Sequence, residues 1–148
     1  GYQYLIAKDK SVVDALEAGT VFRRDPATLQ TERVRASDYG GLFNRSRHTW
    51  NAKVFYENQP RGLTASLRAI YRGRCGFADA NANTILDADN EYVSGYLLLN
   101  AAASKTLGPW LSVQAGVDNL TGYTDPAYIS TLAGRLWYAS LAIELGKK

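Results

Sequence analysis

The sequence lacks features that mark several common classes of protein. Its 148 residues include no Met, one Cys and one His. The single Cys75 excludes an internal disulfide, and no Cys/His spacing typical of a structural zinc site is present. The sequence also has no phosphate-binding loop, nucleophile elbow or dinucleotide fingerprint. We therefore expect no enzymatic activity.

A strong charge of one sign and long apolar runs are missing too. The 17 basic and 14 acidic residues leave a net charge of only +3 and are scattered, so we expect no nucleic-acid binding. No apolar run approaches the roughly 20 residues of a transmembrane helix. This excludes a helical span but not membrane-spanning strands, because each such strand is a weak signal in a sequence.

Alternation of apolar and polar residues is what the sequence does contain. Leu111 and Val113 fall on one side of an extended segment, and Ser112 and Gln114 fall on the other. The same alternation recurs along the chain and predicts an all-β, antiparallel protein. The six predicted strands are 1–7, 48–57, 63–73, 93–107, 111–120 and 135–145.

The connections between these strands alternate in length. Long ones, at 8–47, 74–92 and 121–134, alternate with short turns at 58–62 and 108–110. Outer-membrane barrels have long external loops and short periplasmic turns. The order of connections therefore favours a transmembrane barrel with extracellular long loops and a periplasmic C-terminus.

The first long loop has some predicted structure of its own. Ser11 is the expected N-cap of a short helix over Val12–Ala18. Segments 20–24 and 29–35 flank the turn-forming stretch 25–28 and predict a small hairpin.

Aromatic residues lie near both ends of the predicted apolar faces, as in the aromatic girdles of membrane barrels. The expected girdle residues are Trp50, Tyr56, Tyr71, Trp110 and Trp137. Charged residues on the opposite face would meet a water-filled lumen without a desolvation cost. Those residues are Lys53, Glu57, Arg68 and Arg72.

Two other architectures fit alternating strands. A soluble β-sandwich binding module with a long ligand loop would bury the apolar faces in protein. A small closed barrel formed by self-assembly of this chain is a third possibility.

Four motifs resemble one family. Gln114–Leu120, Tyr123–Pro126 and Gly134–Leu141 are similar to the C-terminal end of TonB-dependent outer-membrane receptors, and Asp38–His48 is similar to the family's passage from loop to strand. The resemblance extends over the whole chain and is most specific in about its last thirty-five residues.

The resemblance implies a transporter. Its fold would be a barrel of about 22 strands with a plugged lumen. Its function would be TonB-dependent uptake of a scarce ligand, such as a ferric siderophore, haem or cobalamin. The implied partners are the rest of the barrel and its plug, TonB through that portion, outer-membrane lipid and the transported ligand.

Two departures from the family pattern qualify this expectation. Leu145 stands where the family's last strand usually ends in an aromatic residue, and Gly146–Lys148 follow it. Six strands cannot close the family's barrel, and the plug domain is missing. We therefore expect this chain to supply the C-terminal six strands of a larger receptor.

The second long loop contains a calcium-like motif. Oxygen-bearing side chains recur from Asp79 at positions one, three, five and nine, an EF-hand-like spacing. Thr84 and Asn90 replace the expected Gly and Glu, so a well-solvated Asn/Asp-rich turn is the alternative. The candidate Ca²⁺ ligands are Asp79, Asn81, Asn83, Ile85, Asp87, Asp89 and Glu91.

Other loop residues are candidates for lining a ligand entrance. They are Tyr39, Phe43, Arg45, Arg47, His48, Tyr123 and Tyr128. His48 would be the residue to ligate haem, although a lone His more often serves as a hydrogen-bonding residue. The six Arg residues of the first loop either attract an anionic ligand or lipopolysaccharide phosphate, or form a solvated surface.

Overall fold

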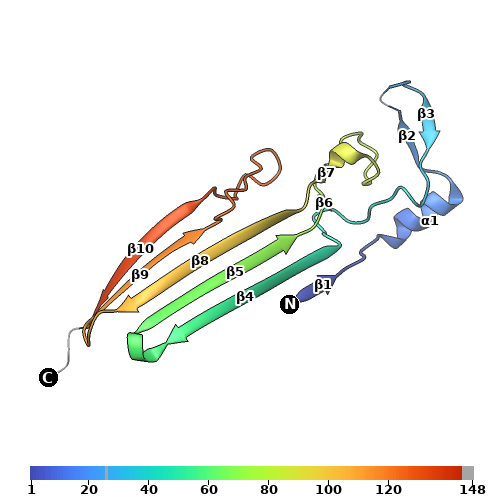
Figure 1. Cartoon of the computed structure of the whole chain (residues 1–148). Coiled ribbons are helices and arrows are strands. Elements are labelled where there is room, and N and C mark those ends of the chain that lie inside the picture. Colours follow the sequence, from blue (N-terminus) through green and yellow to red (C-terminus); the bar gives the residue numbers. More distant parts are fainter. Residues whose placement is uncertain (26, 145–148) are drawn as a thin grey trace. The chain divides into compact units, whose positions relative to one another are not determined.

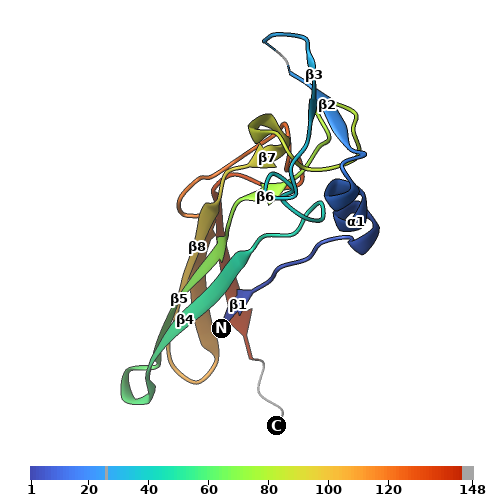
Figure 2. The same ribbon diagram turned by 90° about the vertical axis from the view of Figure 1, so that its right-hand side faces the viewer.

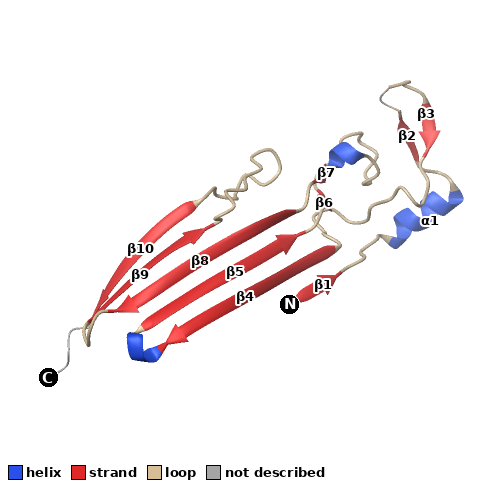
Figure 3. Cartoon of the chain, viewed as in Figure 1, coloured by secondary structure: helices blue, strands red, loops and turns tan. Residues whose placement is uncertain are grey.

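Most of the regular structure is β-strand (Figure 3). The structure is a computed structural model that describes residues 1–25 and 27–144. Its elements are β1 Tyr2–Tyr4, α1 Lys10–Ala18, β2 Phe22–Arg24, β3 Thr31–Arg33, β4 His48–Asn58, η1 Gln59–Arg61, β5 Leu63–Arg72, β6 Cys75–Gly76, η2 Asp89–Glu91, β7 Tyr92–Val93, β8 Tyr96–Thr106, β9 Leu111–Asp118 and β10 Leu136–Ile143. The main sheet has six strands in the order β1-β4-β5-β8-β9-β10. The predicted antiparallel six-stranded sheet is confirmed.

The main sheet is open. β10 forms one edge, and β1 lies along β4 at the other, so the sheet does not close into a barrel. The chain divides into two compact units. The sheet unit contains Gly1, Trp50–Tyr71 and the chain from Tyr96 onward, and the loop unit contains Tyr2–Thr49 and Arg72–Gly95.

The register of the sheet unit preserves the alternation read from the sequence. Leu141 of β10 lies opposite Val113 of β9, and the neighbouring Ser140 lies opposite Gln114. On the other side of β9, Ser104 of β8 also lies opposite Gln114. Because side chains alternate across a strand, this register gathers the apolar residues of neighbouring strands on one face and the polar ones on the other.

The two short connections lie at the same end of the sheet (Figures 1 and 2). β4 and β5 are joined through η1, which ends at Gly62 with φ of 57°. β8 and β9 are joined through Gly108, whose φ is 91°. A positive φ is easily adopted by Gly, which explains how these connections turn so tightly. The loop between β9 and β10 lies at the opposite end (Figure 1).

The loop unit has a small enclosed core. Leu16 of α1 packs with Val34, Tyr39 and Ile85, all of them buried. Ile85 comes from the second long loop, so the two loops fold as one compact unit. From the sequence alone, the two loops are expected to be separate connections.

The helix begins earlier than predicted. The side chain of Asp9, not Ser11, is the N-cap, because it accepts hydrogen bonds from the backbone N and the hydroxyl of Ser11 at 2.8 and 2.6 Å. These hydrogen bonds lower the pKa of Asp9, and the bond from the Ser11 hydroxyl has the largest effect. The helix ends before Gly19, which has φ of 73°.

Strand boundaries account for the remaining corrections. The first strand covers only 2–4 of the predicted 1–7, although the backbone N of Leu5 still donates to the carbonyl of Arg47. The predicted strand 93–107 is divided, because Tyr92–Val93 pairs with β6 and β8 begins at Tyr96. Pro26 in the predicted turn, Leu145 at the predicted end of the last strand, and Gly146–Lys148 lie outside the described residues.

Candidate functional site

The apolar face of the sheet unit is the largest candidate surface. It comprises Trp50, Ala52, Val54, Tyr56, Leu63, Ala65, Leu67, Ala69, Tyr71, Leu97, Leu99, Ala101, Ala103, Leu111, Val113, Ala115, Val117, Trp137, Ala139, Leu141 and Ile143. Several of these side chains are largely exposed, including Leu141 at 69%, Trp137 at 68% and Val54 at 67%. A monomeric soluble protein rarely exposes so continuous an apolar surface, so this face requires an apolar environment or partner.

Aromatic residues lie toward both ends of this face. Near the end with the longer connections, the rings of Trp50 and Tyr71 stack with centroids 5.8 Å apart. Trp137 lies near the same end, at the start of β10. Tyr56 lies close to the β4–β5 turn and Trp110 lies within the β8–β9 connection, both exposed. Small and aliphatic residues occupy the space between.

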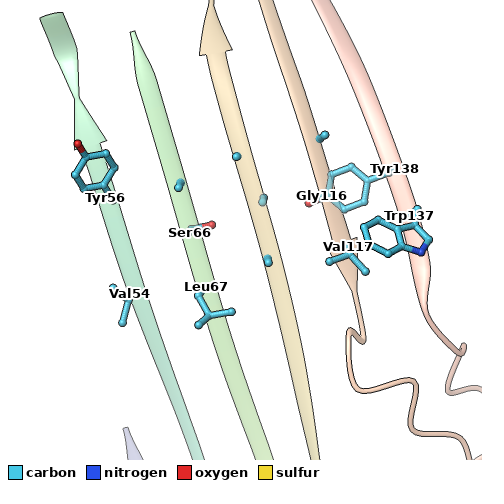
Figure 4. A pocket seen from close by; sticks show the side chains of 13 residues that line it. Val54, Tyr56, Ser66, Leu67, Gly116, Val117, Trp137 and Tyr138 are labelled. Atoms are coloured by element: carbon cyan, nitrogen blue, oxygen red, sulfur yellow. The ribbon is translucent and has the colours of Figure 1, made fainter. Parts of the chain in front are cut away.

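A shallow groove crosses the middle of the apolar face. Its volume is about 490 Å³. Its floor includes the small residues Ala101, Ala103 and Ala115. Figure 4 shows larger side chains on both sides, with Val54, Tyr56 and Leu67 on β4 and β5, and Val117 and Trp137 on β9 and β10. The groove arises because the small side chains of Ala101, Ala103 and Ala115 lie between larger side chains on both sides.

The opposite face of the sheet unit is mixed. Thr64 of β5 and Ser104 of β8 share a hydrogen bond of 2.6 Å between their hydroxyls. Tyr138 lies over Gly116 on the adjacent strand (Figure 4), where a Cβ would collide with its ring. This face therefore combines polar contacts with the packing of an aromatic ring on the neighbouring strand. The sequence pattern alone does not indicate that packing.

The 79–91 loop folds around its own side-chain oxygens. The Asp79 carboxylate accepts hydrogen bonds from the backbone N of Asn83 and Thr84 at 3.2 and 2.7 Å. The Asn81 side chain also accepts from the N of Asn83, and that of Asn83 accepts from the N of Ile85. These oxygens therefore organise the loop backbone.

The other predicted calcium ligands have diverse environments. Glu91 is fully buried and accepts hydrogen bonds from the backbone N of Ala80, Asp87 and Ala88 at 2.7–3.1 Å. Asp89 instead points into solvent and pairs with Arg74 at 2.7 Å. Within 1–25 and 27–144, no group of three or more His, Cys, Asp or Glu residues is placed to hold a metal ion. Calcium binding, which would also use amide and carbonyl oxygens, stays a prediction.

The predicted ligand-entrance residues come from both units, with Tyr39, Phe43, Arg45, Arg47 and His48 in the loop unit and Tyr123 and Tyr128 in the sheet unit. Tyr39 is 4% exposed and belongs to the core of the loop unit, so its predicted role at a ligand entrance is wrong. Arg45 and Arg47 are exposed and border a hollow of only about 20 Å³, which is too small for a ligand. Phe43 is partly exposed.

His48 and Tyr123 each pack against other aromatic rings. The His48 Nδ1 shares a hydrogen bond of 2.8 Å with the hydroxyl of Tyr2, and the His48 ring stacks against Tyr2 and approaches Tyr4. Tyr123 stacks on Tyr96 with centroids 4.7 Å apart. These contacts give His48 and Tyr123 a structural role. Tyr128, in the same loop as Tyr123, is partly buried.

Asn119 is the organising residue that the sequence analysis missed. Its side chain is buried and donates to the carbonyls of Tyr123 and Ala133 at 2.7 and 2.9 Å. Its side-chain oxygen Oδ1 accepts hydrogen bonds from the backbone N of Tyr123 and from the hydroxyl of Thr121. One side chain thus links both ends of the loop between β9 and β10. Asn119 lies within the family-like motif Gln114–Leu120, which gave no indication of this role.

No helix in the described part of the chain is long and apolar enough to cross a membrane. Comparisons with protein-family models, curated proteins and solved structures found no match to this chain.

Proposed function

We propose that the sheet unit forms part of the wall of a bacterial outer-membrane β-barrel of the TonB-dependent receptor type. The observation that carries the proposal is the exposed apolar face, with aliphatic side chains between two sets of aromatic residues. Lipid would cover this face at no hydrophobic cost. The opposite face, with Lys53, Arg68 and Arg72, would line the interior of the barrel.

The soluble-sandwich alternative would need a second protein layer over the apolar face. Apart from the main sheet, the described chain forms two two-stranded sheets, β2–β3 and β6–β7. Their strands are only three and two residues long, whereas β4, β5 and β8 have 10 or 11 residues. Such short strands cannot cover the larger sheet, so a sandwich would require protein outside the described residues.

The function that follows is active uptake of a scarce ligand, for which a ferric siderophore, haem and cobalamin are the candidate classes. In this proposal, the loop unit and the 121–134 loop are extracellular and help to capture the ligand. The missing strands and plug are supplied by the remainder of the receptor, which also contacts TonB. The proposal has no catalytic step.

The first test is the medium in which the full chain folds. We expect aggregation in plain buffer, and cooperative, heat-modifiable β-structure in detergent together with an N-terminal barrel fragment. Circular dichroism and gel mobility measure both. A cooperative, soluble monomer in buffer would contradict the proposal, because the exposed apolar face would then be tolerated in water.

A pair of adjacent variants tests which face meets lipid. Ala139 and Ser140 are the central residues of β10 and lie on opposite faces. Ala139→Arg should destabilise the chain folded in lipid vesicles by about 2–4 kcal/mol, whereas Ser140→Arg should destabilise it by less than about 1 kcal/mol. Equal destabilisation would indicate that lipid contacts neither face preferentially. A larger effect of Ser140→Arg would indicate that lipid contacts the Ser140 face, and either result would contradict the proposal.

A further inference from the structure

The loop unit contains a polar hollow between the β2–β3 hairpin and the 79–91 loop. Its volume is about 480 Å³, which is within the range of small-molecule sites. The β2–β3 hairpin provides Phe22, Arg23 and Arg24 on one side, and the 79–91 loop provides Asn81 and Asn83 on the other. No carboxylate lines it within the described residues.

One buried carboxylate orients the hydrogen-bond donors around this hollow. The Asp87 side chain is fully buried, and its Oδ1 accepts from the side-chain N of Asn81 and Asn83 at 2.9 and 3.0 Å. Its Oδ2 lies 3.3 Å from Arg23 Nη1. Each Asn amide has a second N–H, which this arrangement leaves for another acceptor. Asp87 therefore holds three donor-bearing side chains in fixed positions behind the hollow.

The two Arg residues of the hollow differ in how their charges are balanced. Arg23 pairs with Asp87 and with Glu32, whose Oε1 lies 2.5 Å from its Nε. The Glu32 hydrogen bond raises the pKa of Arg23, which stays protonated. Arg24 donates through Nε to the carbonyl of Leu29 at 3.1 Å but has no carboxylate within 4.0 Å in the described chain. Its guanidinium therefore forms no ion pair within the described residues.

We propose that this hollow binds the phosphate or carboxylate group of a small organic anion. Arg24 supplies the positive charge, and the Asn81 and Asn83 amides supply neutral donors. Phe22, which is about half exposed, offers an apolar surface to the remainder of the ligand. Charge-assisted hydrogen bonds from a guanidinium to such anions are stronger than neutral ones, so Arg24 should dominate the affinity.

This geometry distinguishes the anion site from the calcium site predicted for the same loop. A Ca²⁺ ion is held by several oxygen atoms that face it, usually including carboxylate oxygens. The Asp87 oxygens instead face an Arg cation and two amide N–H groups. The inference concerns the loop unit alone and does not depend on the membrane location of the sheet.

The test is isothermal titration of the full chain, in whichever medium it folds, with inorganic phosphate, citrate and neutral glycerol. Phosphate or citrate should bind and glycerol should not; the tighter of the two anions identifies the preferred group. Arg24→Gln should weaken the binding about tenfold. Arg33→Gln, in the same hairpin, is the matched control, because Arg33 does not line the hollow and contacts the carbonyl of Glu17 instead.

The inference would be overturned if neither anion binds the unmodified chain. It would also be overturned if Arg24→Gln and Arg33→Gln weaken binding equally, since that result indicates general attraction to a basic surface. Amide chemical shifts of Asn81 and Asn83 that respond to Ca²⁺ but not to the anions would assign the loop to the metal. Circular dichroism of both variants establishes that they are folded.

Discussion

The loop unit buries its apolar side chains, whereas the sheet unit exposes most of its own. In the loop unit, Leu16, Val34 and Leu86 are at most 2% exposed. In the sheet unit, Val117, at 5% exposure, is the only large apolar side chain of the described residues that is buried, and the outer strands expose theirs. The loop unit resembles the interior of a soluble domain, whereas the sheet unit is complete only when something apolar covers it.

Polar groups show the same contrast. In the loop unit, the buried carboxylates of Asp87 and Glu91 are matched by donors from their own loop and from Arg23. Across the described chain, no buried side-chain N or O atom is without a hydrogen-bond partner. The backbone along the β10 edge, however, has no neighbouring strand in the described structure. The loop unit is satisfied internally, and the sheet unit depends on its surroundings.

The largest expected effect tests the contrast in burial directly. Leu86→Ala should destabilise the loop unit by about 2–5 kcal/mol, because it removes a fully enclosed side chain and leaves a cavity. Leu141→Ala, which removes the same atoms from the exposed face, should cost less than about 1 kcal/mol in detergent. Hydrogen exchange of amides in each unit measures the two effects separately. Similar losses would show that Leu141 is covered by protein.

The second prediction concerns the buried carboxylate. Glu91→Gln should destabilise the 79–91 loop by about 1–3 kcal/mol, since one of its two oxygens is replaced by an N–H donor that faces backbone N–H groups. Asp89→Asn is the control, because Asp89 is exposed and forms only a surface ion pair. Proteolytic cleavage of the loop should accelerate in the first variant and not in the second.

A third, smaller effect is expected within the sheet unit. Gly116→Ala should cost about 1–2 kcal/mol, because the new Cβ meets the ring of Tyr138 and must displace it. Gly134→Ala places its Cβ 3.5 Å from Thr124, an ordinary contact, and should be nearly neutral. Unfolding in urea with detergent held constant compares them. A neutral Gly116→Ala would mean that Tyr138 does not pack on β9.

The smallest effect is expected from acid. Hydrogen bonds from the Ser11 hydroxyl to Asp9, and from the backbone N of Thr28 and Ala27 to Asp25, lower the pKa of both carboxyls below 3.8. Their stabilisation is therefore complete above that pH and is lost as the pH falls through the lowered values. Circular dichroism from pH 5 to 2 should show early weakening of the helix and hairpin. The double variant Asp9→Asn, Asp25→Asn should flatten this dependence.

The sequence predicted the sheet better than the loops for a physical reason. Strand alternation is local, so residues such as Leu111 and Ser112 indicate their faces without knowledge of the neighbouring strand. The divided strand near Tyr96 was missed, because the pairing of Tyr92–Val93 with β6 depends on residues far along the chain. The apolar pattern also could not decide between lipid and protein as its cover.

The loop unit was harder to predict because its core joins distant segments. Ile85 packs with Leu16, which lies 69 positions earlier, and with Tyr39, which lies 46 positions earlier. No short sequence pattern indicates such contacts. Tyr39 was therefore interpreted as a ligand-facing residue. Asn119 was likewise invisible as a loop organiser, because its role depends on where the carbonyls of Tyr123 and Ala133 lie in space.

The open edges of the main sheet have a consequence for handling the chain. β10 presents eight residues whose outward backbone groups have no strand partner in the described structure, and three-residue β1 can pair with only part of the 11-residue β4. A strand edge of this length is a template for adding another strand, including one from an identical chain. Copies released into water would therefore join edge to edge into growing ribbons, and the rate should rise steeply with concentration. Protein segments that pair with both edges would therefore complete the sheet and also stop this edge-to-edge association.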